Sequence, residues 1–102
     1  FDTSNVTTMH AMFSGCRSLV SLDLSDFDTS NVTDMGWMFC GCLSLKSLNL
    51  SGFDTYNVKN MKYMFEYCNS LRKVIMEYCD GETIDKISEA LEEANIDAKI
   101  ID

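Results

Sequence analysis

Apolar side chains recur along this chain with a period of 26 residues, and the register holds without a gap through three successive units. The units span residues 1–26, 27–52 and 53–78, and each opens with the letters FDT. Six columns contain only apolar residues in all three units: Phe1, Phe27 and Phe53; Val6, Val32 and Val58; Met9, Met35 and Met61; Met12, Met38 and Met64; Phe13, Phe39 and Phe65; Cys16, Cys42 and Cys68. This repetition predicts one structural unit used three times, with equivalent residues stacked side by side.

The first half of each unit has the spacing of an amphipathic helix. In the middle unit, five residues fall within an arc of about 120° on a helical wheel: Val32, Met35, Met38, Phe39 and Cys42. Asn31 occupies the place of an N-cap, with Asp34 positioned to return its hydrogen bond. Gly15 and Gly41 can end the first two helices in the left-handed conformation. The pattern predicts one helix per unit.

The second half of each unit alternates apolar and polar residues. The segments are SLVSLDLS, SLKSLNLS and SLRKVIMEY, and their apolar positions are Leu22 and Leu24, Leu48 and Leu50, and Val74 and Met76. A period of two is typical of a half-buried strand. One helix and one strand cannot bury their own apolar faces, but stacked copies can. We therefore expect an α/β fold, a right-handed leucine-rich-repeat-like solenoid with a parallel sheet on one side and helices on the other.

The repeat stops at Asp80, so residues 1–79 are expected to form three tandem leucine-rich-like repeats. Residues 80–102 read as one more helix and strand of unlike sequence. Thr83 is the expected N-cap of this helix, Asn95 its end, and Ala98 the start of the strand. Because a solenoid needs an atypical terminal unit, we interpret residues 80–102 as a C-terminal capping unit.

Sulfur-containing residues are concentrated in the repeats, which raises two alternatives. Soft sulfur ligands could bind copper or an iron–sulfur cluster, and a thiol pair could carry out redox chemistry. Methionine and free cysteine are also common core residues, and the periodicity favours that interpretation. Cys40 shares its column with Ser14 and Glu66, so we expect its thiol to point outward. No metal or cofactor is expected, and the cysteines are expected to be reduced.

Composition narrows the possible functions. Among 102 residues, 16 are acidic and 8 basic, which gives a net charge of −8. Nucleic acids and anionic membrane surfaces would repel such a protein. No apolar run reaches the length of a membrane span, and no signal peptide opens the sequence. Almost every polar residue recurs as part of the repeat, whereas catalysis needs a unique cluster, so we expect no enzyme and no catalytic residues.

The repeat FDTSNVTDMxxMFxGCxSLxSLDLS resembles that of the BspA-like leucine-rich-repeat bacterial surface proteins. The strand segments LVSLDLSDF and LKSLNLSGF are spaced like the core of leucine-rich repeats in general. The resemblance covers residues 1–78 and implies a cell-surface or extracellular protein that adheres to host matrix proteins, other bacteria or epithelium. It brings no catalytic residues with it.

Two outward columns are candidate partner-binding surfaces. Asp23, Ser47 and Asn49 should point outward from the strands. Trp37 and Tyr63 share an outward column on the expected helices, where they could anchor a partner or simply stack on each other. We therefore expect a non-catalytic binding module, a fragment of an adhesin that recognises a protein or glycan on host or bacterial surfaces. The alternative is a structural spacer that extends another domain from the cell.

The first unit begins at a repeat boundary, at Phe1. This position leads us to expect that further coils precede it. An uncovered first repeat would expose apolar surface, through which the chain could associate.

Overall fold

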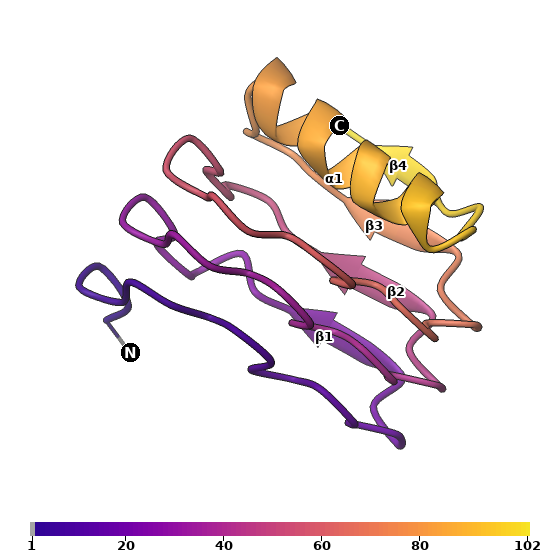
Figure 1. The fold of residues 1–102 in the computed structure, drawn as a ribbon. Coiled ribbons are helices and arrows are strands. Elements are labelled where there is room, and N and C mark those ends of the chain that lie inside the picture. The colour runs from indigo at the N-terminus through magenta and orange to yellow at the C-terminus, as the bar shows by residue number, and fades with distance from the viewer. Residues whose placement is uncertain (1) are drawn as a thin grey trace.

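The computed structural model describes residues 2–102, which form an α/β fold with a four-stranded parallel sheet and one helix (Figure 1). The place of Phe1 in its apolar column lies outside the described residues. The sheet order is β1-β2-β3-β4. The elements are β1 (Ser21–Asp23), β2 (Ser47–Asn49), β3 (Lys73–Ile75), α1 (Gly81–Glu93) and β4 (Lys99–Ile101).

The strands confirm the alternating pattern and its register. Leu22 pairs with Leu48, Leu48 with Val74, and Val74 with Ile100, so equivalent residues of successive strands lie side by side. Leu48 and Val74 are fully buried between more exposed neighbours, as a half-buried strand requires. The strand expected from Ala98 is confirmed as β4, and it keeps the spacing of the repeats although its sequence differs.

The helices expected within the repeats are wrong, because these segments consist of turns. Alternate backbone N–H groups donate to carbonyl oxygens of the following repeat, in the pairs Met9 to Asp34, Ala11 to Gly36, Phe13 to Met38 and Gly15 to Cys40. N–H groups between them bond to the residue three positions earlier, as Met12 does to Met9. An α-helix would instead bond successive N–H groups to the residue four positions earlier. Left-handed residues also interrupt each segment, at Ala11, Trp37 and Tyr63, with φ of 56°, 58° and 59°.

The helix caps expected within the repeats are wrong for the same reason. The side-chain amide of Asn31 donates to the carbonyl oxygen of Ser4 in the previous repeat, at 2.7 Å. Asp34 accepts a hydrogen bond of 2.8 Å from the backbone N–H of Gly36. Short polar side chains that bond to nearby backbone compete with helix formation. Here they hold tight turns and connect neighbouring repeats.

Stacked apolar side chains form the core, as the periodicity predicted. The rings of Phe13 and Phe39 lie 5.8 Å apart and those of Phe39 and Phe65 5.6 Å apart, with nearly parallel planes. Core positions are confirmed for four of the repeat methionines: Met9, Met35, Met38 and Met64. Met12 differs, with 42% of its surface exposed, because no described residue covers it on the first repeat.

The cysteines are all free, and most lie inside. Cys42 and Cys68 are fully buried, which confirms the inward column, and Cys16 is partly buried. The outward position expected for Cys40 is wrong, since only 8% of its surface is exposed. That expectation rested on a helical wheel, and the segment is not a helix.

The threonine of each FDT motif is buried and bonds to the next unit. The hydroxyl of Thr29 donates to the carbonyl oxygen of Asp54 at 3.0 Å and accepts from the backbone N–H of Asp54 at 2.8 Å. Thr3 makes the same pair of bonds with Asp28. Buried polar groups need such partners. The motif therefore serves the stacking of the repeats.

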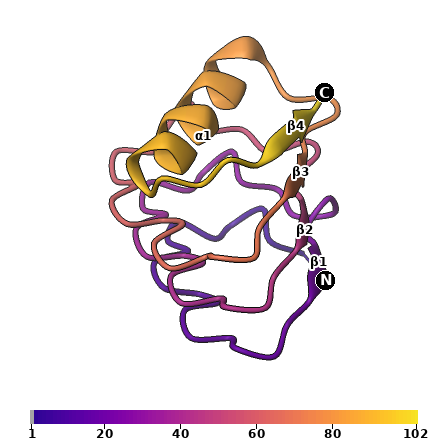
Figure 2. The same cartoon turned by 90° about the vertical axis from the view of Figure 1, so that its right-hand side faces the viewer.

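α1 occupies the last unit and covers the third repeat on the side away from the sheet (Figure 2). Its N-cap is Asp80, which accepts from the backbone N–H of Thr83 at 2.8 Å, so the expected cap at Thr83 is wrong. The Thr83 hydroxyl is instead buried against Thr55. Asn95 follows the helix end in the left-handed conformation, as expected. Among residues 2–102, no helix combines the length and the apolar composition of a membrane-spanning segment.

Candidate binding surfaces

The outward residues of the first two strands form a polar face. Asp23 is exposed, and Ser47 and Asn49 are half-buried. Asp23 and Asn49 each accept a hydrogen bond of 2.9 Å from the backbone N–H two residues later, and so hold the turn that follows the strand. Hydrogen bonding from the side chain and backbone of Ser25 lowers the pKa of Asp23. These side chains point outward as expected, but two of them already have a structural role.

Trp37 and Tyr63 form an exposed aromatic pair. Their ring centroids are 4.6 Å apart and their planes are tilted by 41°, within the geometry of favourable aromatic contacts. Trp37 keeps 39% of its surface exposed and Tyr63 keeps 52%. The two rings therefore contact each other at a tilt and also face solvent. Of the two alternatives left open by the sequence, contact between the rings is observed, and the role of the pair as a partner anchor stays a prediction.

The backbone at this pair is unusual for aromatic residues. Both residues are left-handed, which costs a non-glycine residue about 1 kcal/mol. The conformation belongs to the repeat, because Ala11 shares it. In it, the N–H of Trp37 donates to the carbonyl oxygen of Lys62 at 2.9 Å. Glycine or asparagine would fit these positions with less strain, so the bulky rings are not required by the backbone.

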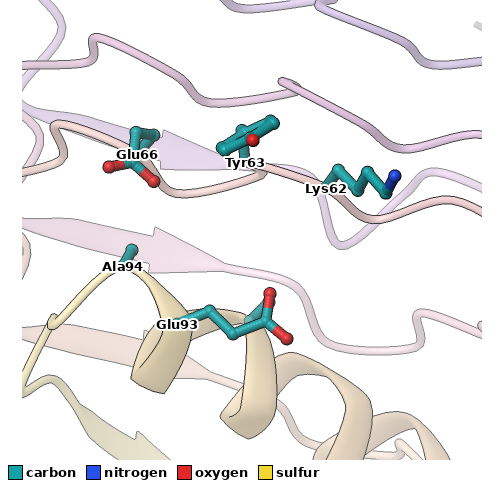
Figure 3. Close-up of a pocket in the computed structure, with 6 residues that line it drawn as sticks. Lys62, Tyr63, Glu66, Glu93 and Ala94 are labelled. Atoms are coloured by element: carbon teal, nitrogen blue, oxygen red, sulfur yellow. The ribbon is translucent and has the colours of Figure 1, made fainter.

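A groove beside Tyr63 separates the third repeat from α1. Six residues line a hollow of about 320 Å³: Lys62, Tyr63, Glu66, Ala90, Glu93 and Ala94. A second hollow of about 180 Å³ shares Lys62, Ala90 and Glu93 and extends along the helix to Lys86 and Glu89. In Figure 3, Lys62, Tyr63 and Glu66 lie along one segment, across from Glu93 at the end of α1 and from its C-cap Ala94. The larger hollow is at the small end of ligand pockets, which span roughly 300–1,000 Å³.

The groove carries an excess of negative charge. Its carboxylates are Glu66, Glu89 and Glu93. Lys86 is already engaged, since its ammonium lies 3.3 Å from Glu82 and donates to the carbonyl oxygen of Thr55 at 2.9 Å. Among residues 2–102 the other ion pair joins His10 to Asp34, so no described basic residue pairs with the three groove carboxylates.

All four tyrosines of the chain lie in the third repeat, and each is exposed: Tyr56, Tyr63, Tyr67 and Tyr78. Tyr67 is left-handed and takes the position of Gly15 and Gly41, while Tyr78 is left-handed and takes the position of Gly52. Exposed tyrosine is enriched at protein interfaces. The groove itself was missed by the sequence analysis, but these replacements of glycine by tyrosine were a signal that the third repeat differs.

Candidate metal and catalytic groups are sparse. Residues 2–102 contain no cluster of three or more His, Cys, Asp or Glu side chains placed to hold a metal ion. His10 is not isolated, however, since its Nδ1 lies 3.2 Å from Asp34, a partner the sequence analysis missed. That carboxylate also accepts from the side-chain amide of Asn60 at 3.1 Å. Asp34 thus joins all three repeats.

Comparison with known proteins identifies one family. The family model described as "Mycoplasma protein of unknown function, DUF285" matches residues 1–101. No curated protein and no solved structure matches the chain.

Proposed function

Because the chain belongs to the DUF285 family of Mycoplasma proteins of unknown function, its role has to be argued from its own surface, and we propose that it is a non-catalytic binding module. In this proposal the module is a piece of a BspA-like bacterial surface adhesin. It binds a protein or glycan on host or bacterial cells. The location at the cell surface rests on the resemblance of the repeat sequence alone.

The proposal includes a leucine-rich-repeat-like solenoid as the wider architecture. Support comes from the register of the strands, in which Leu22, Leu48, Val74 and Ile100 pair in series. Further support comes from the second set of bonds between repeats, including the bridges from Thr8 to Asp34 and from Asp34 to Asn60. A structure in which each unit contacts its neighbours can present a partner with one continuous surface.

The observation that carries the binding proposal is the aromatic pair. Trp37 and Tyr63 sit at left-handed positions where glycine or asparagine would be less strained, yet both rings remain partly exposed. Large, rigid aromatic side chains are favoured anchors at interfaces, because they bury much area and lose little conformational freedom. Strain retained at an exposed site is a reason to look for function there.

The recurrent polar residues argue against an enzyme in this proposal. Thr29, Asn31 and Asp34 each make bonds to backbone or to a neighbouring repeat. Their equivalents elsewhere in the chain do the same, for example Asn57, which donates to the carbonyl oxygen of Ser30. These bonds account for the recurrence of these polar residues in the repeat without a catalytic role. Catalysis would require groups of different function brought together at one place.

Binding to immobilised matrix proteins, epithelial cells and bacterial cells tests the proposal. We expect Trp37→Gly and Tyr63→Gly to reduce binding by tenfold or more, roughly the effect of losing an interface hot spot. Tyr78→Gly is the matched control, because it also replaces an exposed tyrosine at a left-handed position. The spacer alternative predicts that neither Trp37→Gly nor Tyr63→Gly differs from the control.

The first repeat suggests a second contact, which we include in the proposal. Met12 and Val20 are exposed there, and β1 is an edge strand of the sheet. Exposed apolar side chains beside an unpaired strand edge favour association with another chain. Sedimentation measurements over a range of concentrations test this contact, and Val20→Lys should reduce any association.

A further inference from the structure

The groove between the third repeat and α1 has the charge and shape to select one kind of partner. We propose that it binds a basic, arginine-containing segment of a partner protein. This inference rests on the proposed binding function and assigns it a ligand class and a place. Its residues come from two elements, Tyr63 and Glu66 from the repeat and Glu93 from α1.

The carboxylates supply the first part of the argument. Glu66 and Glu93 lie on opposite walls of the hollow, and neither pairs with a basic residue among residues 2–102. Figure 3 shows Glu66 at one end of the labelled segment and Lys62 at the other. A guanidinium group could therefore reach Glu66 at the end of the hollow away from the Lys62 ammonium. Charge-assisted hydrogen bonds from arginine to carboxylate are among the strongest that side chains make.

The aromatic wall supplies the second part. Tyr63 lines the same hollow, and guanidinium groups stack favourably on aromatic faces while they bond to carboxylates in their plane. Trp37 contacts Tyr63 from the neighbouring repeat and limits the positions its ring can take. A tyrosine held in this way loses less freedom when a ligand binds. Trp37 thus acts as a positioning residue for the proposed site.

The size of the site favours an extended segment over a folded element. The main hollow of about 320 Å³ accepts one long side chain, and the second hollow of about 180 Å³ continues along α1. The two hollows share Lys62, Ala90 and Glu93, so an extended peptide could place successive side chains in them. The net charge of −8 would also attract a basic segment from a distance.

The test is a titration of the isotopically labelled chain, followed by NMR, with a short peptide of alternating glycine and arginine. The matched peptide replaces arginine with citrulline, which keeps the shape and removes the charge. We expect the backbone amides of Tyr63, Glu66 and Glu93 to shift with the arginine peptide only. Fluorescence of Trp37 gives a second readout, because it is the one tryptophan in the chain. A neutral oligosaccharide is titrated in parallel.

Three isosteric variants decide the result. Glu66→Gln and Glu93→Gln should each weaken arginine-peptide binding by roughly threefold to tenfold. Glu92→Gln removes the same charge from an exposed site on α1 outside the groove, and should change binding by less than about twofold. Equal binding of the citrulline peptide, equal loss in Glu92→Gln, groove shifts with the oligosaccharide alone, or no shift with any probe would each overturn the inference. None of these outcomes would overturn the proposed function, which depends on the separate comparison of Trp37→Gly and Tyr63→Gly with Tyr78→Gly.

Discussion

The thiol of Cys68 donates a hydrogen bond of 3.0 Å to the carbonyl oxygen of Phe39 in the preceding repeat. Cys42 makes the equivalent bond to Phe13, at 3.2 Å. The cysteine column therefore fills space in the core and also gives a second donor to a backbone carbonyl that already accepts from an N–H of its own repeat, as the Phe39 carbonyl does from Cys42. This relationship explains the recurrence of cysteine without metal or redox chemistry.

Replacing Cys68 tests this role. We expect Cys68→Ala to lower the free energy of unfolding by about 1–3 kcal/mol, since it leaves a cavity and removes one of the two hydrogen bonds that the Phe39 carbonyl accepts. Cys68→Ser should lower the free energy of unfolding less than Cys68→Ala does, if the serine hydroxyl donates in place of the thiol. Urea denaturation of both variants measures the difference. If Cys68→Ala loses no more unfolding free energy than Cys68→Ser, the hydrogen bond does not contribute to stability.

The ionisation of Cys68 gives a pH prediction. Burial, more than the neighbouring Cys42, raises the pKa of this thiol from 9.0 to about 12. The folded state therefore favours the neutral thiol, and this contribution is fully present below pH 9. It is lost as the pH rises from about 9 towards 12, because the unfolded chain ionises first. Urea unfolding at pH 7.5 and 10 should show a smaller alkaline loss in Cys68→Ala than in the wild type.

Phe39 is the central ring of the phenylalanine stack and is fully buried. Phe39→Ala should lower the free energy of unfolding by about 3–5 kcal/mol, because it removes contacts to both neighbouring rings. Phe13→Ala is the control, since Phe13 is partly exposed and has one stacked neighbour. Thermal unfolding followed by circular dichroism compares them. A similar loss in both variants would argue against a continuous stack.

Asp34 should contribute to stability in a pH-dependent way. The backbone N–H of Gly36, with smaller contributions from His10 and Asn60, lowers the pKa of this carboxyl below 3.8. Its contribution is therefore present above pH 3.8 and is lost as the pH falls further. Because the group is partly exposed, we expect no more than about 1 kcal/mol. Asp34→Asn should keep the turn, since Asn60 makes the same turn in the third repeat, but should lose this pH dependence.

That prediction is checked by urea unfolding of wild type and Asp34→Asn at pH 6 and pH 2.5. The two proteins should differ more at pH 6 than at pH 2.5. A constant difference between them would contradict the role assigned to the carboxylate.

The strands and the stacking could be predicted from the sequence because they depend on local alternation and on an unbroken period. Leu48 lies between two polar residues, and its equivalents lie one repeat away on either side. The turn segments could not be predicted, because Met35 and Phe39 have helical spacing while their backbone N–H groups donate to carbonyl oxygens of the following repeat. A helical wheel assumes backbone hydrogen bonds within the segment. The apolar pattern does not indicate which residues those hydrogen bonds connect.

The candidate site was predicted only in part. Trp37 and Tyr63 could be found because a column repeats, and repetition is visible in the sequence. Glu66 and Glu93 could not be placed together, because their proximity depends on how α1 packs over the third repeat. The exposed tyrosines at glycine positions, Tyr67 and Tyr78, are a sequence feature that could have drawn attention to this repeat.

The central claim is that the exposed aromatic pair binds a partner and is not needed for folding. The most direct measurement is the affinity of Trp37→Gly and Tyr63→Gly for the matrix or cell ligand that the wild type binds, with unfolding of each variant measured alongside. The account predicts a loss of affinity of tenfold or more, with a free energy of unfolding within about 1 kcal/mol of the wild type. Unchanged affinity, or a loss that follows unfolding, would contradict it.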